Sequence, residues 1–241
     1  MNGGRPAALV TGSAKGIGRA ILLALATAGY DVAVHYRSSA AAAAEVHREA
    51  AAQGVDVVSL SADVTVESQA RGLVEAAHQA FGRLDVLVNN VGNYHHGPLD
   101  ELTGEIWREM FASNLDSTFF TCQQALPHLR QAPAGGRIVN IGYAGAEQMR
   151  ARPSIAPYSI AKTGVILYSK ALAKAEAANG VTVNVVSPGV MENSVSKPLQ
   201  EIPMDRLGTL DELVAAVEYL ISPTAAYVTG VTLEVAGGWN V

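Results

Sequence analysis

The chain has 241 residues, of which 49% are hydrophobic and 16% charged, and its formal net charge is −5. This composition supports a substantial core and excludes a disordered chain, and the scarcity of basic clusters excludes a global positive field for nucleic acid. The single cysteine excludes an internal disulfide and a multi-cysteine zinc site, and the lack of a long apolar run predicts a cytoplasmic protein with no membrane span and no signal peptide.

Short runs rich in β-branched residues alternate with long, often alanine-rich stretches along the chain. The strand candidates are residues 7–11, 31–36, 55–61, 85–89, 137–141, 181–187 and 232–235. The helix candidates are residues 18–28, 40–53, 66–81, 104–129, 158–179 and 210–221. Several strands are continuously apolar, as in a parallel sheet buried on both faces. The order predicts an α/β fold with one domain over residues 1–241: a single doubly wound parallel sheet of about seven strands, the Rossmann fold, with helices on both faces.

A glycine-rich loop separates the first strand from the first helix, with the spacing Gly-x3-Gly-x-Gly. In such a loop Gly12 allows a tight turn, Gly16 lets the backbone approach a pyrophosphate, and Gly18 lets the helix pack closely on the strand. The helix N-terminus then offers free N–H groups and the positive end of its dipole to phosphates. The loop predicts a dinucleotide site, and the other loop residues assigned to the cofactor are Ser13, Lys15 and Ile17.

The end of the second strand bears on the choice of dinucleotide. An acidic residue there would accept a hydrogen bond from the ribose 2′-hydroxyl of NAD, whereas this strand ends with His35-Tyr36-Arg37-Ser38. Arg37 and Lys15 are donors suited to the oxygens of a 2′-phosphate. We therefore expect NADP(H), with Arg37 and Ser38 among its contacts. The alternative is that both cations are solvated surface charges.

Tyr158 and Lys162 stand four residues apart and therefore share one face of a predicted helix. A nearby cation favours the phenolate and lowers the pKa of a tyrosine from its usual value of about 10. Tyr158 could then exchange a proton with a carbonyl or alcohol oxygen near neutral pH. The spacing alone is common on surface helices. It indicates a catalytic pair here because a dinucleotide loop precedes it in the chain.

These motifs together resemble the short-chain dehydrogenase/reductase family over essentially the whole length, especially its 3-oxoacyl-acyl-carrier-protein reductases and other NADPH-dependent carbonyl reductases. The matching segments are Thr11-Gly12-x3-Gly16-Ile17-Gly18, Asp63-Val64, Asn89-Asn90-Val91-Gly92, Asn114, Tyr158-x3-Lys162 and Ser187-Pro188-Gly189. The resemblance implies an oxidoreductase that interconverts a small-molecule ketone or aldehyde and an alcohol with NADP(H).

The resemblance also implies individual roles. Tyr158 would be the general acid in reduction, Lys162 would lower its pKa and bind the nicotinamide ribose, and Asn114 would hold a water in a proton relay. The implied cofactor contacts are Asp63 and Val64 at the adenine, Asn90 and Gly92 past the fourth strand, and Pro188, Gly189 and Val190 at the nicotinamide face. The end of the chain resembles the family's subunit contact, which implies a homotetramer or a homodimer.

Two segments depart from the family pattern. The serine that normally holds the substrate oxygen is replaced by Tyr143 when counted from the fifth strand, or by Gly145 when counted back from Tyr158. Three interpretations remain: Tyr143 substitutes for the serine, the other catalytic residues suffice with a water, or catalysis is lost. An unreplaced oxyanion donor can cost ~10²–10³ in rate. The segment after Gly189 is also short, with Asn193 where the family has a threonine.

Two other functions stay open. Reduction of a C=N bond, as in pterins, is one, because an imine needs a proton donor but not the same oxygen clamp. A catalytically silent NADP(H)-binding sensor or scaffold is the other, and the intact set of Tyr158, Lys162 and Asn114 argues against it. His95 and His96 supply too few ligands for a metal, so no metal site is expected.

Overall fold

The protein is described by a computed structural model over residues 4–194 and 196–240. Seven parallel strands form one sheet in the order β3-β2-β1-β4-β5-β6-β7. The strands are β1 (Ala7–Val10), β2 (Asp31–Tyr36), β3 (Val57–Ser61), β4 (Val86–Asn89), β5 (Arg137–Ile141), β6 (Thr182–Pro188) and β7 (Thr232–Val235). The chain changes direction across the sheet between β1 and β4, which is where doubly wound sheets bind their ligands. The predicted Rossmann fold is confirmed.

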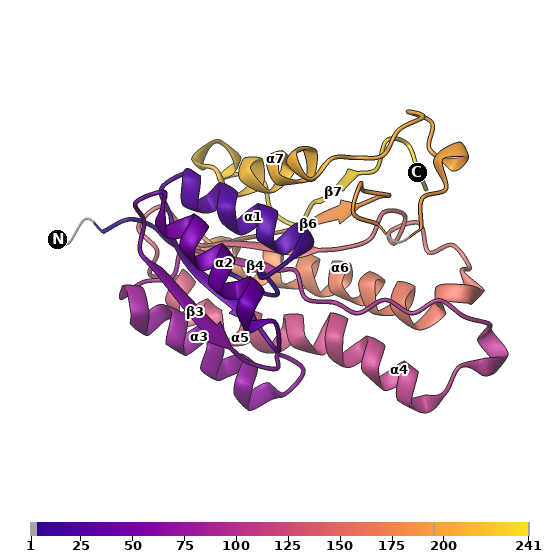
Figure 1. Ribbon diagram of the computed structural model, residues 1–241, viewed down its shortest axis with the longest axis horizontal. Coiled ribbons are helices and arrows are strands. Elements are labelled where there is room, and N and C mark those ends of the chain that lie inside the picture. The colour runs from indigo at the N-terminus through magenta and orange to yellow at the C-terminus, as the bar shows by residue number, and fades with distance from the viewer. Residues whose placement is uncertain (1–3, 195, 241) are drawn as a thin grey trace.

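Helices cover both faces of the sheet (Figure 1). They are α1 (Gly16–Thr27), α2 (Ala40–Ala51), α3 (Glu67–Phe81), α4 (Gly104–Phe111), α5 (Ser117–Leu129), α6 (Ala156–Glu176) and α7 (Leu210–Ile221). Helices α1, α2 and α7 pack on one face, and α3, α5 and α6 pack on the other. Successive strand residues point to opposite faces, so in β1 Ala8 and Val10 enter the first core and Leu9 enters the second.

The predicted helix over residues 104–129 is interrupted, which corrects the sequence analysis. A π-helical turn at Ala112–Asp116 separates α4 from α5 and contains Asn114. Two hydroxyls support the turn: Ser117 Oγ donates to the carbonyl of Ser113 at 2.8 Å, and Thr118 Oγ1 donates to that of Asn114 at 2.9 Å. Serine and threonine that bond back to a carbonyl four residues earlier bend helices, and π-turns are frequent at functional sites.

Other element boundaries differ from the predictions by a few residues. Helix α1 begins at Gly16 and α6 begins at Ala156, each two residues earlier than predicted, while β3 begins at Val57. In the part of the chain that the structure describes, no helix has both the length and the apolar character needed to cross a membrane. The parallel arrangement brings the loops after β1, β2, β4, β5 and β6 to one edge of the sheet, where the predicted site residues lie.

Candidate active site

The loop between β1 and α1 has the backbone that its glycines predict. Gly12 and Gly16 lie in the left-handed region, with φ of 65° and 56°. A Cβ on Gly18 would come within 2.6 Å of the carbonyl oxygen of Gly12, so strand and helix are in close contact there. Helix α1 has no side-chain cap and no acidic residue in its first turn, and its N-terminus therefore suits an anion. Ile17 is half-buried against the core beneath the loop.

His35 of β2 holds this loop, a role that the sequence analysis missed. The N–H of Gly12 donates to His35 Nδ1 at 2.8 Å, and His35 Nε2 lies 3.0 Å from the carbonyl oxygen of Ala62. These partners require a neutral imidazole that accepts at Nδ1 and donates at Nε2, and burial lowers the pKa of His35 accordingly. The Ser13 hydroxyl accepts from the N–H of His35 at 2.9 Å. Ser13 is thus fully buried, with its hydroxyl directed to β2.

Asn90 ties the same loop to β4. Its Nδ2 donates to the carbonyl oxygens of Thr11 at 2.9 Å and Gly12 at 3.3 Å. Its backbone N–H donates to Thr11 Oγ1 at 2.9 Å. Asn90 therefore positions the glycine-rich loop between β1 and α1 (residues 11–18), which we call the phosphate loop. Its amide donor is already in use on the protein itself.

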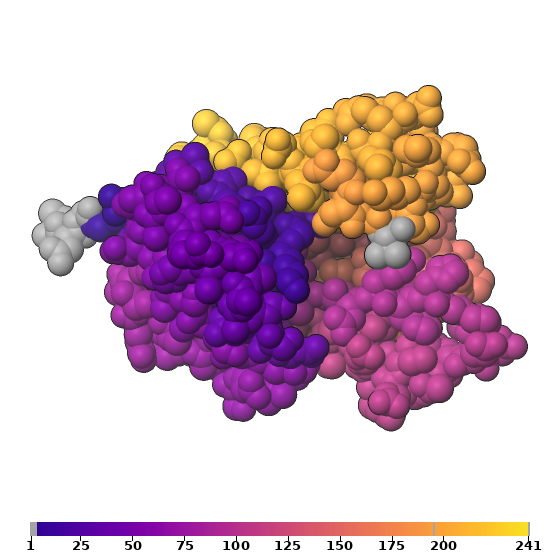
Figure 2. All heavy atoms as spheres, viewed as in Figure 1, coloured from indigo at the N-terminus to yellow at the C-terminus, as the bar shows by residue number. Residues whose placement is uncertain are grey.

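A cavity of about 230 Å³ adjoins the phosphate loop at the ends of β2 and β3. Figure 2 shows the hollow that separates the indigo and purple N-terminal segments from the magenta and orange segments. The predicted cofactor residues that line the cavity are Gly12, Lys15, Arg37, Ser38, Asp63 and Val64. The structure thus brings together the residues that the sequence analysis assigned to the adenosine half of the cofactor.

Asp63 positions Arg37 at the rim of this cavity. Arg37 Nη1 lies 3.5 Å from Asp63 Oδ2, with 62% of the arginine side chain exposed. Asp63 Oδ1 accepts from the N–H of Thr65 at 3.0 Å and from its hydroxyl at 2.7 Å. Burial opposes ionisation of Asp63, but the bonds from Thr65 and the charge of Arg37 prevail and lower its pKa. The carboxylate therefore stays charged and holds the guanidinium beside the site.

Tyr158 and Lys162 share one face of α6, as predicted. Lys162 Nζ donates to the carbonyl oxygen of Ile141 at 2.7 Å and lies 5.9 Å from the centre of the Tyr158 ring. Burial lowers the pKa of Lys162 to about 8. Burial also raises the pKa of Tyr158, and the nearby Tyr143 and Tyr94 add to this effect. The direction for Tyr158 is opposite to the prediction, because burial disfavours the phenolate and the ammonium of Lys162 is directed to the carbonyl oxygen of Ile141.

Asn114 lies in the π-helical turn with its side chain fixed. Its Nδ2 donates to the carbonyl oxygens of Asn93 at 3.0 Å and Met110 at 2.9 Å. Its Oδ1 is buried and has no hydrogen-bond partner within the described ranges. A Cβ on Gly92 would collide with this oxygen and would lie 3.3 Å from Lys162 Nζ. Gly92 therefore lets the amide and the ammonium approach the same corner of the site.

The structure places Tyr143, and not Gly145, against Tyr158. The two tyrosine rings meet edge to face, with centres 5.4 Å apart and planes at 71°. Tyr143 is buried, its hydroxyl accepts from Asn240 Nδ2 at 3.4 Å, and burial raises its pKa. Gly145 has a φ of 85°, and a Cβ there would lie 2.9 Å from Asn240. The residue that contacts Tyr158 is therefore Tyr143.

Two further aromatic residues enclose this corner and were missed in the sequence. Tyr94 lies edge to face on Tyr158, with ring centres 5.0 Å apart, and Trp239 lies in the same way on Tyr143 at 6.0 Å. Tyr94 stands two residues after Gly92, so its place in the loop was the available signal. The contact of Trp239 joins segments far apart in sequence and leaves no local pattern.

The segment after β6 lies between the phosphate loop and the catalytic corner, by which we mean the side chains around Tyr158 and Lys162. Pro188 and Gly189 are half-buried and Val190 is buried, and a Cβ on Gly189 would lie 2.7 Å from Ala236 Cα. Asn193 Nδ2 lies 3.3 Å from the place that a Cβ on Gly16 would take. Asn193 is thus directed to the phosphate loop.

Comparisons with known proteins identify relatives of this chain. A family model described as "Enoyl-(Acyl carrier protein) reductase" matches residues 12–240. The chain is 39% identical over 238 residues to a 3-oxoacyl-(acyl-carrier-protein) reductase of Synechocystis sp., covering 96% of this chain and 95% of that protein. It is 36% identical over 245 residues to glucose 1-dehydrogenase 2 of Bacillus subtilis, covering 97% and 94%. A short-chain dehydrogenase of Burkholderia cenocepacia, solved with NADP, superposes with a TM-score of 0.92 at 31% identity and 98% coverage of both chains.

Proposed function

Because the chain belongs to the short-chain dehydrogenase/reductase family and is an oxidoreductase acting on CH–OH and C=O groups, we propose that it reduces a ketone or aldehyde with NADPH. The same site would oxidise the alcohol in reverse. One observation carries the proposal: Lys162, next to Tyr158, meets Asn114 at Gly92. The neighbours of Gly92 in the chain, Val91 and Asn93, line the cavity that begins at the phosphate loop.

The described residues fit a dinucleotide, and the cationic ones favour NADP(H) over NAD(H). The uncapped N-terminus of α1 suits the pyrophosphate, while Arg37 and Lys15 line the cavity where a 2′-phosphate would lie. No carboxylate follows the second strand directly, and Asp63 is already paired with Arg37. A structural neighbour was solved with NADP. When bound, the reduced cofactor supplies the hydride.

We assign the proton donor as Tyr158. Burial raises its pKa, so the phenol holds its proton at neutral pH and can donate it to the oxygen of the substrate. Lys162 has a pKa of about 8 and is charged below that pH, so its ammonium stabilises the phenolate that forms. The unpartnered Oδ1 of Asn114 suits a water that returns the proton from solvent.

Tyr143 takes the part of the missing serine in this proposal. Its hydroxyl accepts from Asn240 and keeps its own proton available for the substrate oxygen. Reduction of a C=N bond is the second candidate, favoured by the replacement of that serine with a bulky phenol. A cytoplasmic homotetramer or homodimer stays a prediction.

The experiment is a screen of NADPH consumption across acyl thioesters, diketones, sugars, quinones and pterins. We expect turnover with at least one carbonyl compound. Turnover with pterins alone would favour the second candidate, and no turnover with any compound would overturn the proposed activity. Fluorescence titration with NADPH and NADH tests the cofactor separately. We expect tighter binding of NADPH, and equal dissociation constants would reject the assignment of Arg37.

A further inference from the structure

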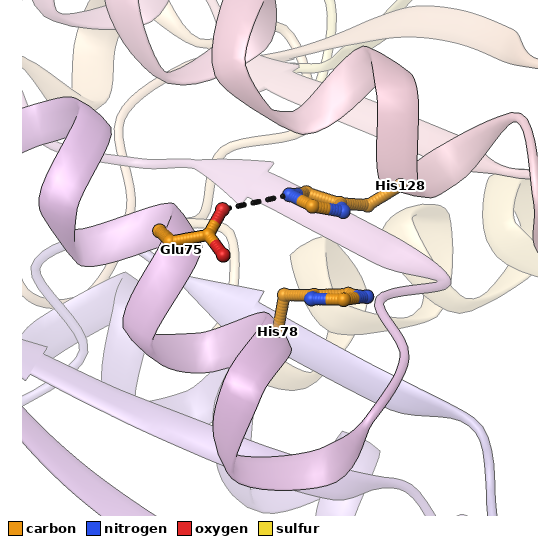
Figure 3. Close-up of side chains that lie close together, drawn as sticks. All are labelled: Glu75, His78 and His128. Atoms are coloured by element: carbon orange, nitrogen blue, oxygen red, sulfur yellow. Dashed lines mark hydrogen bonds and ion pairs between the residues drawn. The ribbon is translucent and has the colours of Figure 1, made fainter.

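Three potential metal ligands meet on the surface between α3 and α5, apart from the residues of the catalytic corner. Glu75 and His78 lie on α3 and His128 lies on α5 (Figure 3). Each offers one ligand atom, and these atoms all lie within 4.8 Å of one another. Both histidines are in the last turns of their helices. Since these helices run back from the loops of the site, the group lies toward the opposite edge of the sheet.

Hydrogen bonds within the described part of the protein leave one nitrogen of this group without a partner. Glu75 Oε2 lies 3.2 Å from His128 Nε2, and Glu75 Oε1 accepts from Gln79 Nε2 at 3.0 Å. The imidazoles of His78 and His128 are stacked, with centres 3.8 Å apart and planes at 18° (Figure 3). His78 Nδ1 is buried and has no hydrogen-bond partner among the residues described. Buried polar atoms without a partner are uncommon, so this nitrogen needs an explanation.

We propose that Glu75, His78 and His128 bind a divalent transition-metal ion of the zinc type. Two imidazoles and one carboxylate are a ligand set that zinc takes, whereas magnesium and calcium prefer oxygen ligands. The side chains are half-buried, with 14% of His128 and 41% of Glu75 exposed, so water can complete the coordination. A bound ion would also supply a partner for an imidazole nitrogen that now has none.

Binding of the ion requires a rotation of the two imidazole side chains. With zinc–nitrogen distances of about 2.0–2.1 Å, neighbouring ligand atoms of a tetrahedral site lie about 3.3 Å apart. Glu75 and His128 already match this spacing, at 3.2 Å. Parallel stacked rings cannot direct their lone pairs at one ion, so binding must tilt the imidazoles apart by side-chain rotation. The two residues stand on helices α3 and α5, which pack together.

The consequence is a cross-link between α3 and α5. An ion that binds only the folded chain stabilises it. Both histidines must be free of protons to bind the ion.

The test uses the full-length, tag-free protein and Zn²⁺ in equilibrium dialysis, with Co²⁺ as a spectroscopic substitute. We expect one ion per chain and visible Co²⁺ absorption bands typical of imidazole ligands. His78→Ala and His128→Ala should each weaken binding by at least ~10–100-fold, the loss already typical of removing a hydrogen-bond partner of a ligand. Absence of binding by the wild-type protein would overturn the proposal, whatever the variants do.

A matched control separates this site from adventitious binding. His47 of α2 bonds to Ser59 Oγ at 3.0 Å and lies outside the group, so His47→Ala should leave zinc affinity unchanged. Equal affinity in His47→Ala, His78→Ala and His128→Ala would assign the ion to another place and refute the site. Thermal unfolding gives a second measurement: zinc should raise the Tm of the wild-type protein and have little effect on His128→Ala.

Discussion

The two halves of the site are built in different ways. In the cofactor half, short polar bonds tie the phosphate loop to its neighbours: Gly12 donates to His35 at 2.8 Å, and Asn90 donates to Thr11 at 2.9 Å. In the substrate half, aromatic rings from separate segments meet edge to face around Tyr158, and the hydroxyl of Tyr143 accepts a long bond of 3.4 Å. The first arrangement suits a ligand common to many enzymes, and the second leaves room for a substrate particular to this one.

The largest effect is expected where the two halves meet. Tyr158→Phe removes the proposed proton donor and keeps the ring contacts of the site, so kcat for carbonyl reduction should fall by ~10²–10⁴. The dissociation constant of NADPH should stay near the wild-type value, because the loop contacts lie elsewhere. Stopped-flow kinetics and fluorescence titration measure the two quantities. Full turnover by Tyr158→Phe would remove Tyr158 from the mechanism.

The substrate half is tested next through Tyr143. Tyr143→Phe removes only a hydroxyl, and kcat/KM for reduction should fall by as much as ~10²–10³ if no other donor holds the substrate oxygen. Tyr143→Ser should retain part of the rate, since it restores a hydroxyl nearer the backbone. A steady-state comparison of both variants with wild-type protein decides the matter. If neither differs from wild type, the residue is structural.

The cofactor half is tested by adding a methyl group at Gly18, where the phosphate loop and helix α1 are in close contact. In Gly18→Ala the new methyl would lie 2.6 Å from the carbonyl oxygen of Gly12, and the loop must move to accommodate it. Overpacking of this kind costs about 1–3 kcal/mol, and this cost falls on the loop conformation that binds the cofactor, so NADPH should bind about 5–150-fold more weakly. Gly72→Ala on α3 is the matched control, because a Cβ there meets nothing within 4 Å. Equal affinity for NADPH in both variants would contradict the proposed tight loop.

A smaller effect is expected at Arg37. The side chain is largely exposed, so loss of its bond to a 2′-phosphate in Arg37→Ala should cost about 1.5 kcal/mol, close to a tenfold weaker affinity for NADPH. NADH affinity should not change. Arg19→Ala serves as a control, because Arg19 is also exposed and pairs with Glu49 on the outer surface. Equal losses for NADPH and NADH would show that Arg37 does not select the cofactor.

The smallest expected effect is a change of kcat/KM with pH. The pKa of Lys162 is lowered to about 8, so its side chain is charged below that pH and neutral above it. With Tyr158 still protonated, kcat/KM for reduction should be level near neutral pH and decline as the pH rises through about 8. A pH profile of kcat/KM measures this. A decline that begins only near the usual lysine pKa of about 10.4 would contradict the role given to burial.

The sequence predicted most of the cofactor half because its chemistry is local. Gly12, Gly16 and Gly18 act through backbone geometry that depends on a few neighbouring residues, and the structure has that geometry. The role of His35 was missed because its partners, Gly12 and Ala62, are 23 and 27 residues away. The spacing of a motif does not show which side chain of the next strand supports the loop.

The substrate half was harder to predict because its contacts join distant segments. Tyr143 and Asn240 are 97 residues apart, so no periodic pattern predicts that they touch. The direction of the pKa shift of Tyr158 was wrong because helical spacing gives the neighbour but not the depth of burial. The π-helical turn was also missed, since its hydrophobic pattern continues through residues 104–129.

The π-helical turn has a consequence for how this enzyme can vary in length. A π-turn closes its hydrogen bonds over five residues, so it accommodates one residue more than an α-helix of the same span. Deleting a single residue between Ala112 and Asp116 would convert the π-turn into regular α-helix and fuse α4 and α5 into one helix. Asn114 would then leave the corner that it shares with Gly92. Insertions and deletions should therefore accumulate before Gly104 or after Leu129, while the number of residues between them stays fixed.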